Sequence, residues 1–323
     1  MVRFNRVGLP IALASLAALF SVGAFAQDLA DEVTIQPQAG NPRTQVDEEV
    51  LVRGRRMSEI EFDIDVYIRE FIGEVVALPP GGGHSRWRYS VCPGIYNLEP
   101  TAAQYVVDRI SLLAQQVGLK PGEPGCNPEI MIIFTVDADD VAAHMVEENP
   151  RLFRPGGPVC CMQLGLEALD EFVVSDSPVR WWHVSMPIDP LHGQRAIHMP
   201  RDGIGNYPVI AVEGPSHIHS GVIDKLERAI VIVDATQLLG TTWQEIGDYL
   251  ALISLAQVNP KTDPSSYDSI LNLFSNPAAY TGLTDWDISY VRALYEINLE
   301  RLPGLQENQL VDRMAKRERE PID

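Results

Sequence analysis

This chain of 323 residues has seven histidines, and their spacing decides whether any of them could bind a metal ion or act in catalysis. His217 and His219 are the most suggestive pair, because residues two apart on a strand direct both imidazole rings to one face. A carboxylate from Glu213 or Asp224 could complete a site of the kind that zinc accepts. The pair also fits exposed loop residues. Zinc at His217 and His219 is therefore an alternative to our main reading, in which no residue binds a metal.

The other histidines give weaker signals. His144, Glu147 and Glu148 approximate the inverted zinc-peptidase motif H-x-x-E-H, but a glutamate stands where the second histidine is needed. His183 follows two tryptophans in a strand-like run, which favours a packed or hydrogen-bonded ring. No phosphate-binding G-x-x-x-x-G-K or G-x-G-x-x-G motif occurs. We therefore assign no catalytic residue and expect no cofactor.

Two cysteines are placed for a disulfide. Cys92 and Cys126 flank the predicted helix of the β-α-β unit described below, with Cys126 at the entrance to the next strand, and disulfides persist in exported proteins. We expect the two to be bonded, with a pair of free buried thiols as the alternative. Cys160 and Cys161 are adjacent, so they could join only through a strained ring. A vicinal disulfide, a redox clip and an intermolecular link all stay open for that pair.

The N-terminus has the features of a secretory signal. Arg3 and Arg6 precede an apolar run, and Ala24-Phe25-Ala26 matches the cleavage pattern. We expect residues 1–26 to be removed and the protein to be exported, to the periplasm or outside the cell. A permanent membrane anchor is the alternative, but a proline interrupts the run. No later segment reaches eighteen uninterrupted apolar residues, so we expect no transmembrane segment after cleavage.

Charge excludes one class of partner. The formal net charge is -19, and no basic stripe with interleaved aromatic residues reverses the sign locally, so nucleic-acid binding is not expected. Residues 27–57 are acidic and polar and predict a disordered leader, whereas 304–323 end in a mixed-charge run and predict a charged, frayed tail. A single domain over 58–303 lies between them.

The pattern of apolar residues predicts helices and strands in this domain. An amphipathic helix is expected over 59–77, after the capping box of Ser58 and Glu61, and a short helix after Asp137. Strand 86–98, helix 101–117 and strand 129–137 form a predicted β-α-β unit, whose right-handed crossover makes the strands parallel neighbours. Two more strands are expected over 179–188 and 228–236. Long irregular connections are expected over 150–178 and between these last two strands.

The C-terminal half has the most distinctive order. Thr242 and Glu245 form a capping box that opens a helix apolar nearly all round, which must therefore be central. A Ser269-Ile270-Leu271 segment follows. Thr284, within Leu283-Thr284-Asp285-Trp286-Asp287, can then cap a last amphipathic helix.

This order resembles the catalytic half of the metzincin-type zinc peptidases. In that family an edge strand, an active-site helix, a Ser-Ile-Met turn and a helix introduced by Leu-Thr-x-x-Asp follow one another. The sequence is also similar to a group of exported bacterial proteins that share this half. The resemblance is best over 229–297 and extends to 86–137. It implies an α+β, zincin-like fold: a mixed sheet with a β-α-β unit, a central buried helix and a C-terminal helix. Alternatively, the segment is only a buried helix followed by an amphipathic one.

The zinc motif of that family is absent. Tyr249 and Ile253 stand at the two histidines of H-E-x-x-H, Leu250 at the glutamate, Asn259 at the third ligand and Leu271 at the methionine of the turn. Zinc needs imidazole, thiolate or carboxylate donors, and its bound water needs a general base. The zinc peptidase activity of the family is therefore not implied for this chain.

We interpret the sequence as an exported pseudoenzyme, a non-catalytic zincin-like scaffold with a binding or structural role in the cell envelope. Its partner would be a protein or another envelope component. The alternative is a metal-dependent hydrolase or peptidase with relocated ligands, drawn from His217, His219 and an acid. A third reading is an envelope interaction module that uses its 150–178 loop.

Overall fold

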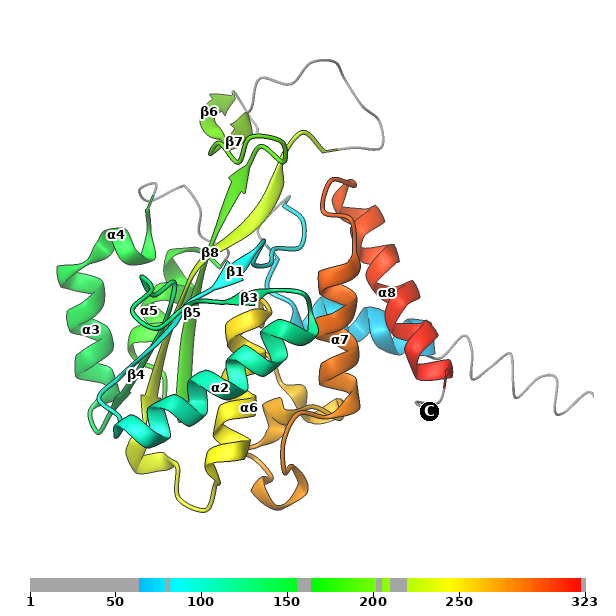
Figure 1. Ribbon diagram of the computed structural model, residues 1–323. Helices are drawn as coiled ribbons and strands as arrows, with labels where there is room; N and C mark the ends of the chain where they lie inside the picture. Colours follow the sequence, from blue (N-terminus) through cyan, green and yellow to red (C-terminus); the bar gives the residue numbers. More distant parts are fainter. Residues whose placement is uncertain (1–63, 79–81, 156–163, 202–204, 210–219, 321–323) are drawn as a thin grey trace, which may run out of the picture. The chain divides into compact units, whose positions relative to one another are not determined.

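A computed structural model describes residues 64–78, 82–155, 164–201, 205–209 and 220–320, with side chains described outside 197–201 and 205–209 (Figure 1). Several predicted features therefore lie outside the described residues: the signal, the leader, the Ser58 capping box, the Cys160-Cys161 pair, and His217 and His219.

The main sheet is mixed and has four strands in the order β2-β4-β8-β5. Strands β2 (Pro93–Tyr96), β4 (Ile130–Thr135) and β8 (Ile223–Asp234) run parallel, and β5 (Val179–Ile188) pairs antiparallel with β8. All ten residues of β5 are buried, as in strands covered on both faces. The α+β class is thus confirmed. The resemblance implied an edge strand before the central helix, but β8 is internal and β5 lies at the edge.

The β-α-β unit forms as predicted, with helix α2 (Pro100–Gln116) joining β2 to its parallel neighbour β4 (Figure 1). Glu99 starts the helix, because its carboxylate accepts hydrogen bonds from the backbone N–H groups of Thr101 and Ala102. Gly118 follows the helix with φ of 81°, a left-handed conformation that glycine adopts without a steric penalty.

The strand predicted over 86–98 is divided in two. Strand β1 (Ser90–Val91) pairs with β3 (Lys120–Pro121) in a separate two-stranded sheet, and β2 joins the main sheet. The break falls at Cys92, whose carbonyl oxygen accepts hydrogen bonds from the N–H groups of Glu129 and Ile130. Pro93, which has no N–H to donate, then begins β2.

Helices cover both faces of the main sheet (Figure 1). Helices α3 (Ala138–Glu148), α4 (Pro150–Phe153) and α5 (Gly165–Val173) pack on one face, against side chains of β5 and β8. Helices α4 and α5 show that the prediction of an irregular connection over 150–178 was wrong for the described part of that segment. The reason is tertiary: the apolar side of α5 is buried, and this packing stabilises a helix too short to form by propensity alone.

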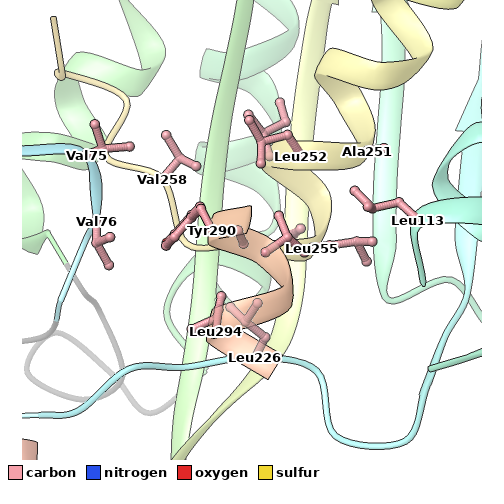
Figure 2. Close-up of a cluster of buried hydrophobic side chains, with 14 of the residues drawn as sticks. Val75, Val76, Leu113, Leu226, Ala251, Leu252, Leu255, Val258, Tyr290 and Leu294 are labelled. Carbon is pink, nitrogen blue, oxygen red and sulfur yellow. The ribbon is translucent and has the colours of Figure 1, made fainter. Parts of the chain in front are cut away.

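Helix α6 (Trp243–Leu255) lies on the opposite face, and every residue from 245 to 255 is buried. Figure 2 shows apolar side chains of α6 packed with those of the helix at 64–75, α2, β8 and α7. Val76, which follows the first of these helices, and Val258, which follows α6, belong to the same cluster. The labelled residues are Val75, Val76, Leu113, Leu226, Ala251, Leu252, Leu255, Val258, Tyr290 and Leu294. The predicted central helix is confirmed. Gly247 lets α2 approach, because a Cβ there would lie 2.8 Å from Cγ of Arg109.

Two further helices follow, α7 (Asp285–Glu296) and α8 (Pro303–Arg319). One side of α8 is fully packed, through Leu310, Val311, Met314 and Ala315, so residues 303–319 form a core helix where we predicted a charged, frayed tail. Its charged residues lie on the other side, where Arg313 and Arg317 pair with Glu296.

Short elements complete the described chain. A hairpin of β6 (Ile197–Arg201) and β7 (Gly205–Val209) lies in the connection between β5 and β8 that we expected to be irregular. The 3-10 turns are η1 (Ala235–Gln237), η2 (Pro264–Ser266), η3 (Ile270–Asn272) and η4 (Pro277–Ala279). Within the described ranges, no helix has both the length and the apolar character needed to cross a bilayer.

The disulfide predicted between Cys92 and Cys126 is present, with the Cα atoms 6.1 Å apart and 34 residues of separation. Its removal by Cys92→Ser and Cys126→Ser together should lower the free energy of unfolding by about 4 kcal/mol, because the unfolded chain regains the entropy of an open loop. Urea denaturation of the double variant and the oxidised protein measures the difference. An equal midpoint in both proteins would contradict the assignment of a stabilising cross-link.

Candidate functional site

The positions that correspond to the zinc motif lie at the end of α6. Tyr249 is 5% exposed, and Leu250 and Ile253 are completely buried. The helix ends at Leu255, and the chain then runs in extended conformation towards Asn259. Asn259 is partly buried, and its N–H donates a 2.7 Å hydrogen bond to the carbonyl of Val75. These side chains belong to the core and offer no imidazole, thiolate or carboxylate to a metal.

Aromatic rings fill the space around Tyr249. Its ring centroid lies 6.3 Å from that of Trp181 on β5 and 5.0 Å from that of Phe274, which follows η3. Burial raises the pKa of the Tyr249 hydroxyl, so the group stays neutral. The region between α6, the edge strand and η3 is therefore packed with side chains.

The last carbonyl groups of α6, and that of Val258 in the chain just after it, accept hydrogen bonds from side chains of three other parts of the chain. His183 and Trp181 of β5 donate to the carbonyls of Ile253 and Val258, at 2.6 and 2.8 Å. In the same way, Trp87 Nε1 donates to Ser254 O at 2.7 Å, and Tyr295 Oη donates to Leu255 O at 2.8 Å. The last carbonyls of a helix have no partner within it, so these bonds satisfy groups that would otherwise be buried unpaired.

His183 has the packed and hydrogen-bonded position predicted for it. The ring is 5% exposed, and burial lowers its pKa to about 4, so the imidazole is neutral at pH 7. A carbonyl oxygen can only accept, hence Nε2 carries the hydrogen. The ring joins the edge strand to the helix.

The Ser269-Ile270-Leu271 segment forms the turn η3 and is held by the first turn of α7. Asp287 accepts hydrogen bonds from Ser269 Oγ at 2.6 Å and from the N–H of Ile270 at 2.8 Å. Thr284 Oγ1 accepts a hydrogen bond from the N–H of Asp287, and the Asp287 carboxylate accepts one from the N–H of Thr284 in return, which confirms Thr284 as the cap of α7. Burial raises the pKa of Asp287, whereas these hydrogen bonds act in the opposite direction.

Helix α5 is tied across the edge strand to the chain that follows Asn259. Glu171 of α5 pairs with Lys261, with 2.5 Å between Oε2 and Nζ. The buried guanidinium of Arg180 on β5 donates to the carbonyls of Phe172, Val173 and Ser175. Only a small cavity of about 70 Å³ remains between α5, β5 and Lys261.

The candidate ligands within the described residues lie on separate elements. His144, Glu147 and Glu148 are exposed on α3, and His192 pairs with Asp189. Asp224 lies near the start of β8 and accepts a 2.9 Å hydrogen bond from the N–H of Gly83, and burial raises its pKa. In the part of the chain that the structure describes, no three His, Cys, Asp or Glu side chains are arranged to hold a metal ion.

A larger pocket opens at the other end of α6. It has a volume of about 640 Å³ and lies between the carboxyl ends of β2, β4 and β8 and the first turn of α6. We call it the strand-end pocket; its lining residues are Asn97, Leu98, Phe134, Thr135, Val136, Ala235, Leu238, Thr241, Thr242, Trp243 and Ile246. No sequence motif had predicted this pocket. The available signal was the predicted β-α-β unit, since ligands of open parallel sheets bind beyond the carboxyl ends of the strands.

Comparisons with protein-family models, with curated proteins and with solved structures found no match to this chain.

The buried histidines should make the fold sensitive to acid. An unfolded histidine takes up its proton near pH 6.5, whereas burial lowers the folded pKa of His183 and of His84 to about 4. Unfolding therefore consumes protons in this window, and stability falls as the pH falls from about 6.5 to 4. His183 alone should lower the free energy of unfolding by about 3 kcal/mol over that range.

The measurement is urea denaturation at pH 7 and at pH 4.5, in the wild type and in His183→Gln. Glutamine keeps an N–H donor for the carbonyl of Ile253 but does not titrate. The variant should lose less stability than the wild type on acidification. The raised pKa of Asp287 makes the fold more stable as the pH falls, but this contribution is the same in the wild type and in the variant. Parallel pH profiles would show that His183 does not titrate as described.

The carboxylate that holds η3 gives a second test. Asp287→Asn replaces one of the accepting carboxylate oxygens by an NH₂ group, which cannot accept from Ser269 Oγ or from the N–H of Ile270. The substitution should therefore lower the free energy of unfolding by about 2 to 3 kcal/mol. Asp285→Asn is the matched control, because Asp285 is exposed in the same helical turn, and it should change stability by about 0.5 kcal/mol or less. Equal effects of the two substitutions in thermal denaturation would contradict the anchoring role of Asp287.

Proposed function

We propose that this protein is an exported, non-catalytic zincin-like scaffold with a binding or structural role in the cell envelope. The observation that carries the proposal is the burial of Tyr249, Leu250 and Ile253 at the positions of two zinc ligands and the general base. Apolar packing occupies the place where a metal-bound water would have to be activated.

The arrangement around η3 supports the zincin-like part of the proposal. The segments that carry the resemblance lie in contact: η3 packs against α6, and Asp287 of the Leu-Thr-x-x-Asp segment bonds directly to Ser269. The side chain at the methionine position, Leu271, is 8% exposed and belongs to the same core cluster as Tyr249. The turn is thus held beneath the central helix without a metal ligand.

The packing around Tyr249 supports the non-catalytic part. A peptidase must expose its catalytic centre to the substrate, but Tyr249 is buried and packs against Trp181 and Phe274. A glutamate at position 250 or histidines at 249 and 253 would be buried polar groups, which cost stability unless they are paired. The disulfide between Cys92 and Cys126 is in keeping with an oxidising, exported location.

Metal analysis tests the proposal. Protein purified without chelator should contain far less than one equivalent of zinc after dialysis, and should not cleave a casein substrate. A chelator should leave its melting temperature unchanged, because a metal held only by the native state would stabilise the fold by mass action.

Stoichiometric zinc together with a chelator-dependent loss of several degrees would overturn the proposal. In that event, the zinc content of the double variant His217→Ala, His219→Ala tests the alternative, a metal-dependent hydrolase with relocated ligands. The variant should lose the zinc if these two histidines are its ligands. His144→Ala is its matched control, because His144 is exposed on α3.

A further inference from the structure

The strand-end pocket is open, in contrast to the packed end of α6. Its volume of about 640 Å³ is within the range of small-molecule sites. Three parallel strands end at it, and the chain passes from β8 through η1 to the start of α6 at this edge of the sheet (Figure 1). Rigid elements therefore form its walls.

None of the described residues that line the pocket is charged. Seven are apolar, and the other four are one asparagine and three threonines. A charged ligand would lose its hydration here without gaining an ion pair, which is costly. The lining therefore selects an uncharged ligand, and the net charge of -19 further disfavours an anion.

Trp243 gives the pocket an exposed aromatic surface. It is 44% exposed in the first turn of α6, and its ring lies edge-on to the buried ring of Phe134, with the centroids 6.2 Å apart. Val136, at the end of β4, is 76% exposed beside it. Large exposed apolar groups gathered around a concavity are typical of ligand sites, and aromatic rings pair favourably with other rings.

The polar groups of the pocket are mostly committed within the fold. Thr135 and Thr241 donate their hydroxyls to the backbone carbonyls of Asp137 and Leu238, and Thr242 Oγ1 accepts from the N–H of Glu245. The Asn97 side chain makes no hydrogen bond within the described part of the chain. One uncommitted amide remains, which can both donate and accept.

Asn97 also has an unusual backbone. It is the one non-glycine residue of the described ranges with positive φ, at 59°. Asparagine adopts this left-handed conformation more readily than other residues with a Cβ. The conformation turns the chain after β2 and leaves the exposed Asn97 on the wall of the pocket.

We propose that the strand-end pocket binds a small, uncharged aromatic molecule that carries one hydrogen-bonding group, of the phenol or aryl amide class. The ring packs against Trp243, and the polar group bonds to the amide of Asn97. This rests on the binding role proposed above, but not on the zincin-like ancestry or on the absence of metal.

The test uses saturation-transfer NMR on the purified full chain with three probes of one shape: 4-methylphenol, 4-methylbenzoate and 4-methylbenzylammonium. The neutral probe should bind with a Kd on the order of 1 mM, as expected for so few atoms, and the two ions at least about tenfold more weakly. Equal binding of neutral and charged probes, or no binding of 4-methylphenol at about 10 mM, would overturn the inference.

Two variants locate the site. Trp243→Ala should weaken 4-methylphenol binding by about tenfold or more. Asn97→Gly should also weaken it while leaving the melting temperature equal or higher, because glycine relieves the positive φ. Tyr89→Ala is the matched control, since Tyr89 is 67% exposed and does not line the pocket. Unchanged binding in Trp243→Ala, with the fold intact by circular dichroism, would refute the assignment.

The outcome is separable from that of the proposed function. A zinc-free, inactive protein that does not bind the phenol would refute the pocket alone. A zinc-containing peptidase that binds the phenol through Trp243 would refute the non-catalytic scaffold and leave the pocket in place.

Discussion

Burial of α6 on every side is the constraint on which the rest of this structure depends. A helix with no exposed face between 245 and 255 must pair its charged side chains inside the protein. Asp248 does so through the guanidinium of Arg109, with 2.6 Å between Oδ1 and Nε, and through the N–H of Leu283. Glu245 is used in the capping box with Thr242. The polar residues of the helix therefore tie it to α2 and to the chain before α7.

The two ends of this helix differ in how the backbone groups that have no partner within the helix are hydrogen-bonded. At the carboxyl end, side-chain donors from His183 on β5, from Trp87 and from Tyr295 on α7 bond to the successive carbonyls of Ile253, Ser254 and Leu255, which joins these elements to the helix. At the amino end, the capping box of Thr242 bonds the N–H groups of Thr242 and Glu245 locally. No distant element has to close over that end, and the strand-end pocket lies there.

The same contrast separates the packed region around Tyr249 from the open strand-end pocket. Tyr249, Leu250 and Ile253 contribute to the packing that holds α6 in place, so a polar substitution at any of them would remove core contacts. The turn η3 is anchored by hydrogen bonds to Asp287. The helix, the turn and the capped helix are thus joined by hydrogen bonds and apolar packing.

The sequence by itself determined the capping box of Thr242, the cap at Thr284, the β-α-β order, the central position of α6 and the pairing of Cys92 with Cys126. Their signals are local patterns or, for the cysteines, positions on either side of the predicted helix. Only the tertiary structure decided the helical state of α5 and the packing of α8. Each helix has a few apolar residues among many charged and polar ones, and these form a buried side only when the helix packs against the rest of the protein. It also decided the ring donors at the end of α6 and the strand-end pocket. These join residues as distant as Trp87 and Ser254, or Asn97 and Trp243, and a sequence pattern cannot show which distant side chains meet when the sheet and helices pack.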